Sequence, residues 1–376
     1  MVAKLFSDKL AVLEEQNRFR TLKSFDSQTL LFSLNDYLGL ALHPKVKAAA
    51  IDTINDCGVG ARSARLLTSQ LKSHDKLESE FANFLGKERA LIFSTGYAAN
   101  VAIFTSLLNK NDIVFADRFI HASIIDGIRY SKAKLVRFRH NDIASLKKHL
   151  FRFKDFSGRK VIATEGLFSM DGDLALLSQI QQLASESESI LFVDEAHSFG
   201  IYGPSGRGIA DQVGVLDKVD IHLVTFAKSL GTAGAVVTGS DELIDGLINF
   251  ARGFIYSSAT PPPLMSATSA SLSIIRSKEG DELRKKLFNN VKKMRDFFAS
   301  HKIKIPSDQT PIIPLLADNS QMLEKLHRRL LENKIYVPII KSPTVPKNEE
   351  RLRISVLATH TDSDLELFFN IFESIL

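Results

Sequence analysis

A lysine lies where an apolar run of residues meets a glycine-rich turn. The run covers residues 220–225, and Lys228 follows it in the turn 226–234. An ammonium group at the end of a buried strand is partly desolvated, which lowers its pKa toward the range where the neutral amine acts as a nucleophile. A second apolar run ends in Asp194, with His197 three residues further on. The sequence therefore predicts an amine, a carboxylate and an imidazole at one sheet edge.

Lys228 and Asp194 together match the needs of pyridoxal 5'-phosphate (PLP). The aldehyde of this cofactor condenses with a lysine amine, and a carboxylate partner keeps its pyridine nitrogen protonated. We therefore predict that Lys228 holds PLP as a Schiff base and that Asp194 pairs with the ring nitrogen.

A phosphate site is predicted where the apolar run 90–94 leads into Gly96 and Tyr97 and then into a helix. The first backbone N–H groups of a helix and the positive end of its dipole bind phosphate. Strand–glycine–helix turns are common, so the pattern is weak alone. It gains weight because ligands of α/β sheets bind at the carboxyl ends of the strands, where Asp194 and Lys228 are also expected.

Three further side chains have types suited to this chemistry. His121 follows another strand end and could stack on a planar ring or transfer a proton, although such a histidine is more often a helix cap or a surface residue. Ser169 offers a hydroxyl to a phenolate oxygen, in a segment that is otherwise a turn. Arg353 lies in a C-terminal strand, where arginine is usually a surface residue but could also bind a substrate carboxylate through two parallel hydrogen bonds.

Composition narrows the class of protein. The chain has 376 residues, enough for about two domains, with the hydrophobic and charged content of a soluble globular protein. Cys57 is the single cysteine, which favours a reducing cytoplasm. No apolar run reaches the roughly 20 residues of a membrane span, so we expect no membrane partner.

Other function classes lack their motifs. The net charge is +5, but the lysines and arginines are scattered along the chain and form no basic stripe. We therefore expect no nucleic-acid partner. Residues 58–63 lack the third glycine of a dinucleotide fingerprint, and the chain has no P-loop motif. The histidines show no metal-ligand spacing, and we expect no metal.

Strand-like and helix-like segments alternate through the middle of the chain, which predicts an α/β fold with a mostly parallel sheet. The expected strands are 90–94, 112–116, 134–138, 160–164, 189–193, 221–225 and 235–238. Beyond the prolines 261–263 we expect a long helical stretch at 264–301, strands at 312–316, 336–340 and 352–356, and helices at 319–332 and 361–375. The predicted domains are 1–42, a helix and extended segment that packs with the small domain; 43–262, the large PLP-binding domain; and 263–376, a small α+β domain.

These motifs, in this order, resemble the α-oxoamine synthase family of PLP-dependent enzymes. The resemblance extends from Asn35-Asp-Tyr-Leu-Gly39 to Ala358-Thr-His360. It implies an aspartate-aminotransferase-like fold of type I, with a mostly parallel seven-stranded sheet and a smaller α+β C-terminal domain. It also implies a cytoplasmic homodimer with active sites at the subunit interface.

The resemblance assigns further roles around the cofactor. It makes Lys228, His121, Asp194 and His197 the catalytic residues, with His121 stacked over the ring and His197 and Ser169 at the phenolate oxygen. The residues that would hold the phosphate or flank the cofactor are Gly96, Tyr97 and Thr225, with Ser257 or Ser258 reaching the phosphate of the partner subunit.

Pro343-Thr-Val-Pro346, followed by Arg351-Leu-Arg353, resembles the branch that joins L-alanine to a pimeloyl thioester in biotin biosynthesis. That branch implies substrate contacts from Arg20, Thr344 and His121, with Arg353 on the carboxylate of alanine. The acyl donor stays open between pimeloyl-CoA and a pimeloyl carrier protein. The chain departs from the family pattern at Ala227, where glycine is usual.

Two alternatives stay open at this point. One is the same chemistry on another amino acid, such as glycine C-acetyltransferase or another α-oxoamine synthase activity. The other is a noncatalytic family member, which the presence of Lys228, Asp194 and His197 argues against.

Overall fold

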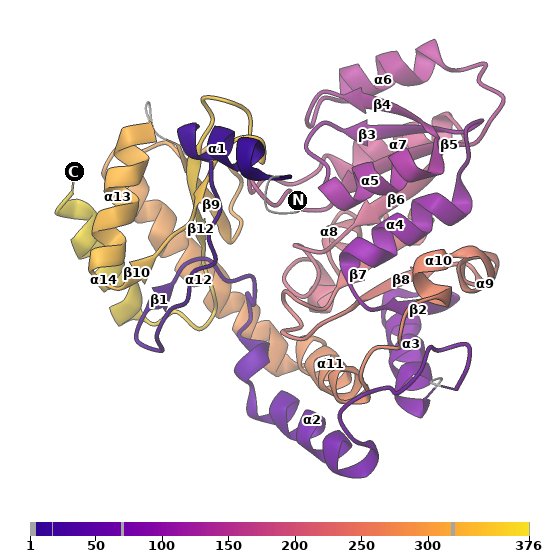
Figure 1. Ribbon diagram of the computed structural model, residues 1–376, viewed down its shortest axis with the longest axis horizontal. Helices are drawn as coiled ribbons and strands as arrows, with labels where there is room; N and C mark the ends of the chain where they lie inside the picture. The colour runs from indigo at the N-terminus through magenta and orange to yellow at the C-terminus, as the bar shows by residue number, and fades with distance from the viewer. Residues whose placement is uncertain (1–4, 17, 69–70, 317–319, 376) are drawn as a thin grey trace. The chain divides into compact units, whose positions relative to one another are not determined.

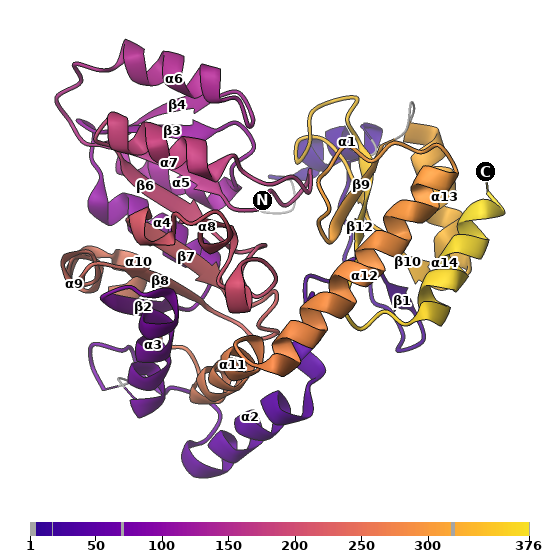
Figure 2. The ribbon, with the colours of Figure 1, turned by 180° about the vertical axis from the view of Figure 1, so that it is seen from behind.

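The computed structural model describes residues 5–16, 18–68, 71–316 and 320–375 (Figures 1 and 2). The chain forms two compact units. The smaller unit comprises Met1–Leu34, Asn290–Val356 and His360–Leu376, and the larger unit comprises Asn35–Asn289 and Leu357–Thr359. Among the described helices, none combines the length and the apolar character needed to cross a membrane.

The larger unit is built on a seven-stranded sheet with the order β2-β8-β7-β6-β5-β3-β4. Its neighbouring strands are parallel except at β8, which is antiparallel to both β2 and β7. The strands are β2 (Arg89–Phe93), β3 (Ile113–Asp117), β4 (Lys134–Phe138), β5 (Lys160–Glu165), β6 (Ile190–Asp194), β7 (Ile221–Thr225) and β8 (Ala235–Gly239). The prediction of a mostly parallel seven-stranded sheet is confirmed.

Helices cover this sheet because its central strands are apolar on both faces. All five residues of β3 are buried, as are all five of β8. Helix α4 (Gly96–Leu107) packs on β7 and β8 and lies beside α5 (Ala122–Ser131) (Figure 1). The remaining helices of the sheet region are α3 (Lys72–Leu85), α6 (Ile143–Arg152), α7 (Leu177–Glu186), α8 (Ile209–Gln212), α9 (Asp241–Phe250) and α10 (Arg252–Ile255).

The helices that follow the proline run differ from the prediction in where they begin and end. Helix α11 (Pro262–Ile275) begins inside the proline run, where a missing N–H costs no helical hydrogen bond. The predicted stretch 264–301 is divided, because α11 ends before Arg276 and α12 (Lys278–Ser300) starts anew. Since α11 packs against α2 (Pro44–Cys57) and α3, it belongs to the larger unit.

The smaller unit is α+β. It holds a three-stranded antiparallel sheet in the order β11-β12-β9 and a parallel pair, β1 (Leu30–Leu31) with β10 (Ile335–Tyr336). Its other elements are α1 (Ser7–Glu15), β9 (Ile312–Leu316), α13 (Ser320–Glu332), β11 (Ile339–Ile340), β12 (Arg351–Ser355) and α14 (Asp362–Glu373). The single strand predicted at 336–340 is instead two short strands, because Pro338 cannot donate to a ladder.

The boundaries of the compact units differ from those of the predicted domains. Residues 35–42 and 263–289 group with the larger unit, and so does the short segment Leu357–Thr359. The backbone N–H of Ala358 donates to the carbonyl of Tyr37, which ties that segment to the loop 35–39. The division therefore falls inside α12, between Asn289 and Asn290.

Candidate functional site

A cavity of about 230 Å³ lies at the carboxyl ends of the parallel strands of the larger unit. The ends of β5, β6 and β7 supply Glu165, Asp194 and Thr225, and the loop after β7 supplies Lys228. The structure brings most of the predicted cofactor residues together at this cavity: Gly96, Tyr97, His121, Asp194, His197, Thr225 and Lys228.

Lys228 is held in a tight loop between β7 and β8. The backbone N–H of Phe226 donates to the carbonyl of Gly234, and that of Gly231 donates to the carbonyl of Lys228. Gly231 has a φ of +65°, and a Cβ there would lie 2.2 Å from the backbone nitrogen of Ala41. Only glycine fits this turn, which fixes the path of the chain around the half-buried Lys228.

Asp194 is a buried carboxylate whose two oxygens are both engaged. Its Oδ1 accepts the backbone N–H of Ala196 at 2.9 Å, and its Oδ2 accepts Nδ2 of Asn100 at 3.0 Å. Asn100 Nδ2 also lies 3.0 Å from the hydroxyl of Ser123. Sequence reasoning missed Asn100, although it lies one helical turn after Gly96 and therefore on the same face of α4.

His197 is fixed by a tyrosine far away in the sequence. The hydroxyl of Tyr37 lies 2.7 Å from Nδ1 of His197, and both side chains are buried. This hydrogen bond sets the orientation of the imidazole ring. Tyr37 belongs to the loop that carries the motif Asn35–Gly39, but no local pattern indicates its partner.

His121 caps α5 and faces the cavity. Its Nδ1 accepts the backbone N–H of Ser123 at 3.3 Å and lies 2.7 Å from the hydroxyl of the same residue. Desolvation lowers the pKa of the imidazole. The charge of Asp194 raises this pKa and the charge of Lys228 lowers it, and the net pKa lies below the usual value. The side chain is therefore a neutral imidazole at physiological pH, able to accept or donate a proton.

The N-terminus of α4 lies close to the end of β7. Thr95 caps the helix by accepting the backbone N–H of Ala98 at 3.0 Å. A Cβ at Gly96 would lie 2.5 Å from the methyl carbon of Thr225, so the close approach requires glycine. Tyr97 donates its hydroxyl to Asp126, and this hydrogen bond raises the pKa of the phenol.

Glu165 is a cavity residue that sequence reasoning did not identify. It ends β5, is 3% exposed, and lies in register with Asp194 on the adjacent strand. Burial raises the pKa of its carboxyl group well above the usual range, and the neighbouring charge of Asp194 adds to the effect. An acidic residue at the end of a buried strand was the available sequence signal.

The other predicted site residues do not line this cavity in the described part of the chain, and their roles stay predictions. Ser169 lies in the turn after β5, and Ser257 and Ser258 follow α10. The remaining three, Arg20, Thr344 and Arg353, belong to the smaller unit. Arg353 is buried there, and its Nη1 donates to the hydroxyl of Ser355 at 2.8 Å.

The cavity has the groups that PLP requires. It offers a lysine amine, a carboxylate, an imidazole and a helix N-terminus within one cavity. Among the described residues, three of its buried polar atoms have no hydrogen-bond partner: Asn100 Oδ1, Glu165 Oε1 and Thr225 Oγ1. Because buried polar groups are nearly always paired, these atoms indicate a polar ligand.

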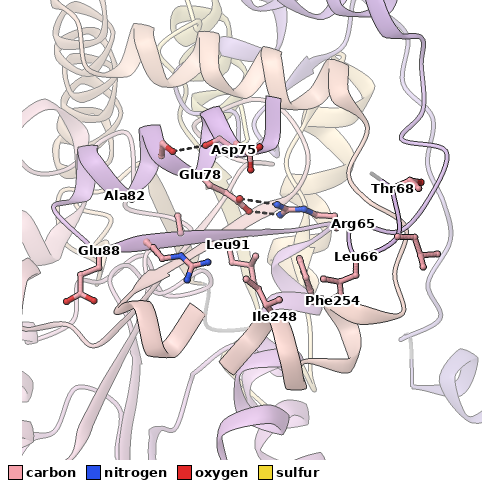
Figure 3. A pocket seen from close by; sticks show the side chains of 14 residues that line it. Arg65, Leu66, Thr68, Asp75, Glu78, Ala82, Glu88, Leu91, Ile248 and Phe254 are labelled. Carbon is pink, nitrogen blue, oxygen red and sulfur yellow. Dashed lines mark hydrogen bonds and ion pairs between the residues drawn. The ribbon is translucent and has the colours of Figure 1, made fainter. Parts of the chain in front are cut away.

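A second, larger pocket of about 610 Å³ lies beside α3 and β2 (Figure 3). In Figure 3 the side chains of Arg65 and Glu78 point toward each other, and their charges are paired through two hydrogen bonds of 2.5 and 3.0 Å. Glu78 also accepts the backbone N–H of Ile92 at 2.8 Å. The pocket holds none of the predicted catalytic residues, and its buried ion pair anchors the loop before α3 to the sheet.

The fold and the cavity together define a PLP-dependent enzyme of fold type I. A solved structure of SPT (serine palmitoyltransferase) with a PLP internal aldimine matches 99% of this chain and 98% of its own, with a TM-score of 0.93 and 27% identity. The chain belongs to the aminotransferase class I and II family, whose model matches residues 27–372. Its cofactor is pyridoxal 5'-phosphate.

Two relatives carry a more particular name. The chain is 39% identical over 372 residues to the 8-amino-7-oxononanoate synthase of Geotalea daltonii, which covers 96% of this chain and 95% of that protein. The crystal structure of 8-amino-7-oxononanoate synthase from Francisella tularensis matches with a TM-score of 0.79 and 32% identity, over 93% of this chain and 98% of that one. The resemblance to the α-oxoamine synthases is therefore confirmed.

Proposed function

We propose that this protein joins L-alanine to a pimeloyl thioester, with loss of CO2, to form 8-amino-7-oxononanoate in biotin biosynthesis. One observation carries the proposal: the residues Lys228, Asp194, His197 and His121 meet at one cavity in a chain whose near full-length relatives bear that enzyme's name. The acyl group is delivered as a thioester of CoA or of a carrier protein.

The bound cofactor supplies the electron sink that stabilises a carbanion at the α-carbon of alanine. Asp194 holds a proton on the pyridine nitrogen, and its own position is fixed by Asn100 and the backbone of Ala196. Lys228 Nζ anchors the cofactor and then acts as the base that removes the α-proton. His121, as a neutral imidazole, would stack on the cofactor ring and donate a hydrogen bond to the oxyanion that develops at the thioester carbonyl oxygen.

The oxygen side of the cofactor ring is assigned to His197 and Ser169. Tyr37 orients His197 through the 2.7 Å hydrogen bond to Nδ1. The cofactor phosphate binds at the N-terminus of α4, near Gly96, Tyr97 and Thr225. Gly96 supports this assignment because it places no side chain of its own at the start of the helix.

The substrate carboxylate is assigned to Arg353, and the acyl donor to Arg20 and Thr344. Arg353 is buried and its Nη1 is held by Ser355, which suits a guanidinium kept in one orientation. Arg20 and Thr344 are exposed in this chain, as contacts to a large donor require.

The protein acts as a cytoplasmic homodimer, without a nucleic-acid or membrane partner. The single cysteine supports the reducing compartment. Beside the second pocket, Leu66 and Leu67 are 53% and 77% exposed, an apolar surface that a second copy would cover. Ser258 lies next to it, bridged to Ala64, and it or Ser257 reaches the partner's cofactor phosphate.

A substrate panel tests the proposed reaction. Purified protein loaded with PLP is incubated with L-alanine, glycine or L-serine and with pimeloyl-CoA, pimeloyl carrier protein, acetyl-CoA or succinyl-CoA. We expect release of CO2 and a free thiol with alanine and a pimeloyl donor. Turnover with glycine and a short acyl-CoA alone would assign another branch of the family, and no turnover with any pair would support a noncatalytic role.

A further inference from the structure

Glu165 and Asp194 are two acidic side chains at the same end of adjacent parallel strands. They are register partners in the ladder of β5 and β6, and they are 3% and 5% exposed. Neighbouring strands lie about 4.8 Å apart, so two carboxylates at paired positions repel each other strongly when both are ionised and buried. One of the two is expected to hold a proton.

Hydrogen bonds decide which carboxyl group stays ionised. Asp194 receives a donor on each oxygen, from the backbone of Ala196 and from Asn100. Glu165 accepts the backbone N–H of His121, but its Oε1 has no partner in the part of the chain that the structure describes. Because donors favour the ionised form, Asp194 is the anion and Glu165 the protonated group.

The surrounding charges support the same distribution. Three elements face Glu165 with charged groups: Asp194 from β6, Asp117 from β3, and Lys228 from the loop after β7. Two carboxylates oppose ionisation of Glu165 and one ammonium favours it, while complete burial acts against the charge. The balance raises the pKa of this carboxyl group well above its usual value.

We infer that Glu165 is a neutral carboxylic acid in the active protein, that it anchors the backbone of His121, and that it donates its O–H to the cofactor bound in the cavity. The inference rests on the proposed site, since it assigns the ligand to PLP. It explains why, among the residues that the structure describes, a buried carboxyl oxygen at the wall of a cavity has no hydrogen-bond partner. It also leaves Asp194 as the anion of this pair, so the negative charge stays with the residue assigned to the pyridine nitrogen.

The replacement Glu165→Gln tests the charge because it keeps shape, neutrality and a donor, whereas Glu165→Leu removes the donor. We expect E165Q to bind PLP more tightly than E165L does, because glutamine keeps a donor for the cofactor. E165L should weaken PLP binding roughly 5- to 100-fold, because it removes the donor to the cofactor and also the acceptor of the His121 backbone N–H. Equal losses in E165Q and E165L would overturn the inference, because they would mean that an ionised carboxylate is required.

Infrared spectroscopy of the protein at neutral pH gives a readout independent of turnover. The carbonyl stretch of a protonated carboxyl group should be present in the wild type and absent in E165Q. Glu195→Gln is the matched control, because Glu195 is also buried but is ionised. Burial opposes the charge of Glu195. The nearby His222 and the donors from Ser198 and the Ala210 backbone outweigh this effect and lower the pKa of the carboxyl group.

E195Q should keep the carboxylic acid band. A band that persists unchanged in E165Q, or that is missing from the wild type, would overturn the inference. Because the band is recorded without substrates, failure of the proposed condensation leaves this test intact. Circular dichroism of each variant confirms that it is folded.

Discussion

His140 joins two strand-end loops that carry site residues, and its removal is a sharp test of the structure. Its Nδ1 lies 2.8 Å from Asp117 and its Nε2 lies 2.8 Å from Asp173. Asp117 ends β3 just before the loop to His121, and Asp173 closes the turn that contains Ser169. His140→Gln removes the positive charge that bridges Asp117 and Asp173. The amide of glutamine can replace only part of the two hydrogen bonds.

The size of the effect follows from the pKa of His140. Burial opposes the charge, but the hydrogen bonds with Asp117 and Asp173 outweigh it and raise the pKa from 6.5 to about 10. A raised pKa in the folded protein adds stability that is complete below the unfolded value and is lost as the pH rises through the folded value. Each pH unit between the two removes about 1.4 kcal/mol.

The assay is unfolding of the apoprotein, followed by heat or denaturant, at several pH values. At pH 6.5 we expect H140Q to be less stable than the wild type by roughly 3–5 kcal/mol, the effect of breaking a buried ion pair. Between pH 6.5 and about 8.5 this difference should shrink by about 2 kcal/mol, or roughly 3 °C in Tm for a chain of 376 residues. Asp173→Asn keeps one carboxylate partner and should retain part of the pH slope.

A difference between wild type and H140Q that stays constant over this pH range would contradict the charge assigned to His140. It would mean that His140 is neutral in the folded protein and that the two carboxylates are stabilised in another way. Since the bridge also fixes the loops of His121 and Ser169, H140Q should bind PLP more weakly, which fluorescence or absorbance titration measures.

Three further predictions concern the cavity. Tyr37→Phe removes the hydrogen bond to His197, worth roughly 1 kcal/mol, so kcat/KM should fall about fivefold. An unchanged kcat/KM in steady-state assays would show that the His197 ring is held by other contacts. Asn100→Leu leaves Asp194 short of one donor, so the pH dependence of the bound cofactor's absorbance should shift, whereas an unshifted titration would contradict the assigned pairing. Gly96→Ala should weaken PLP binding because its Cβ meets the methyl group of Thr225, and Thr225→Ser, which removes that methyl group, should restore it; a double variant as weak as G96A would contradict the steric cause.

The sheet of the larger unit could be predicted because buried parallel strands have a clear pattern. Its strands are mostly short apolar runs, and all seven are found within a residue or two of the expected positions. Ligand sites of such sheets lie at the carboxyl ends of the strands, so Lys228, Asp194 and His121 were predictable from position and residue type.

The role of Tyr37 and the significance of Glu165 depend on contacts between segments that are distant in the sequence. Tyr37 and His197 are 160 residues apart in the chain, and their hydrogen bond follows from the path of the loop 35–39. Glu165 gains its significance from pairing with Asp194, which requires the strand order β5-β6. The boundaries of the compact units differ from the predicted domain boundaries because α11 packs on α2 and α3 and so joins the larger unit.

The most direct test of the account is the identity of the lysine that carries the cofactor. The holoprotein is reduced with borohydride, digested and analysed by mass spectrometry, with Lys228→Ala treated in parallel. We expect a pyridoxyl group on Lys228 in the wild type and none in the variant. A pyridoxyl group on a different lysine, or none on any peptide of a protein that is folded and saturated with PLP, would contradict the central claim.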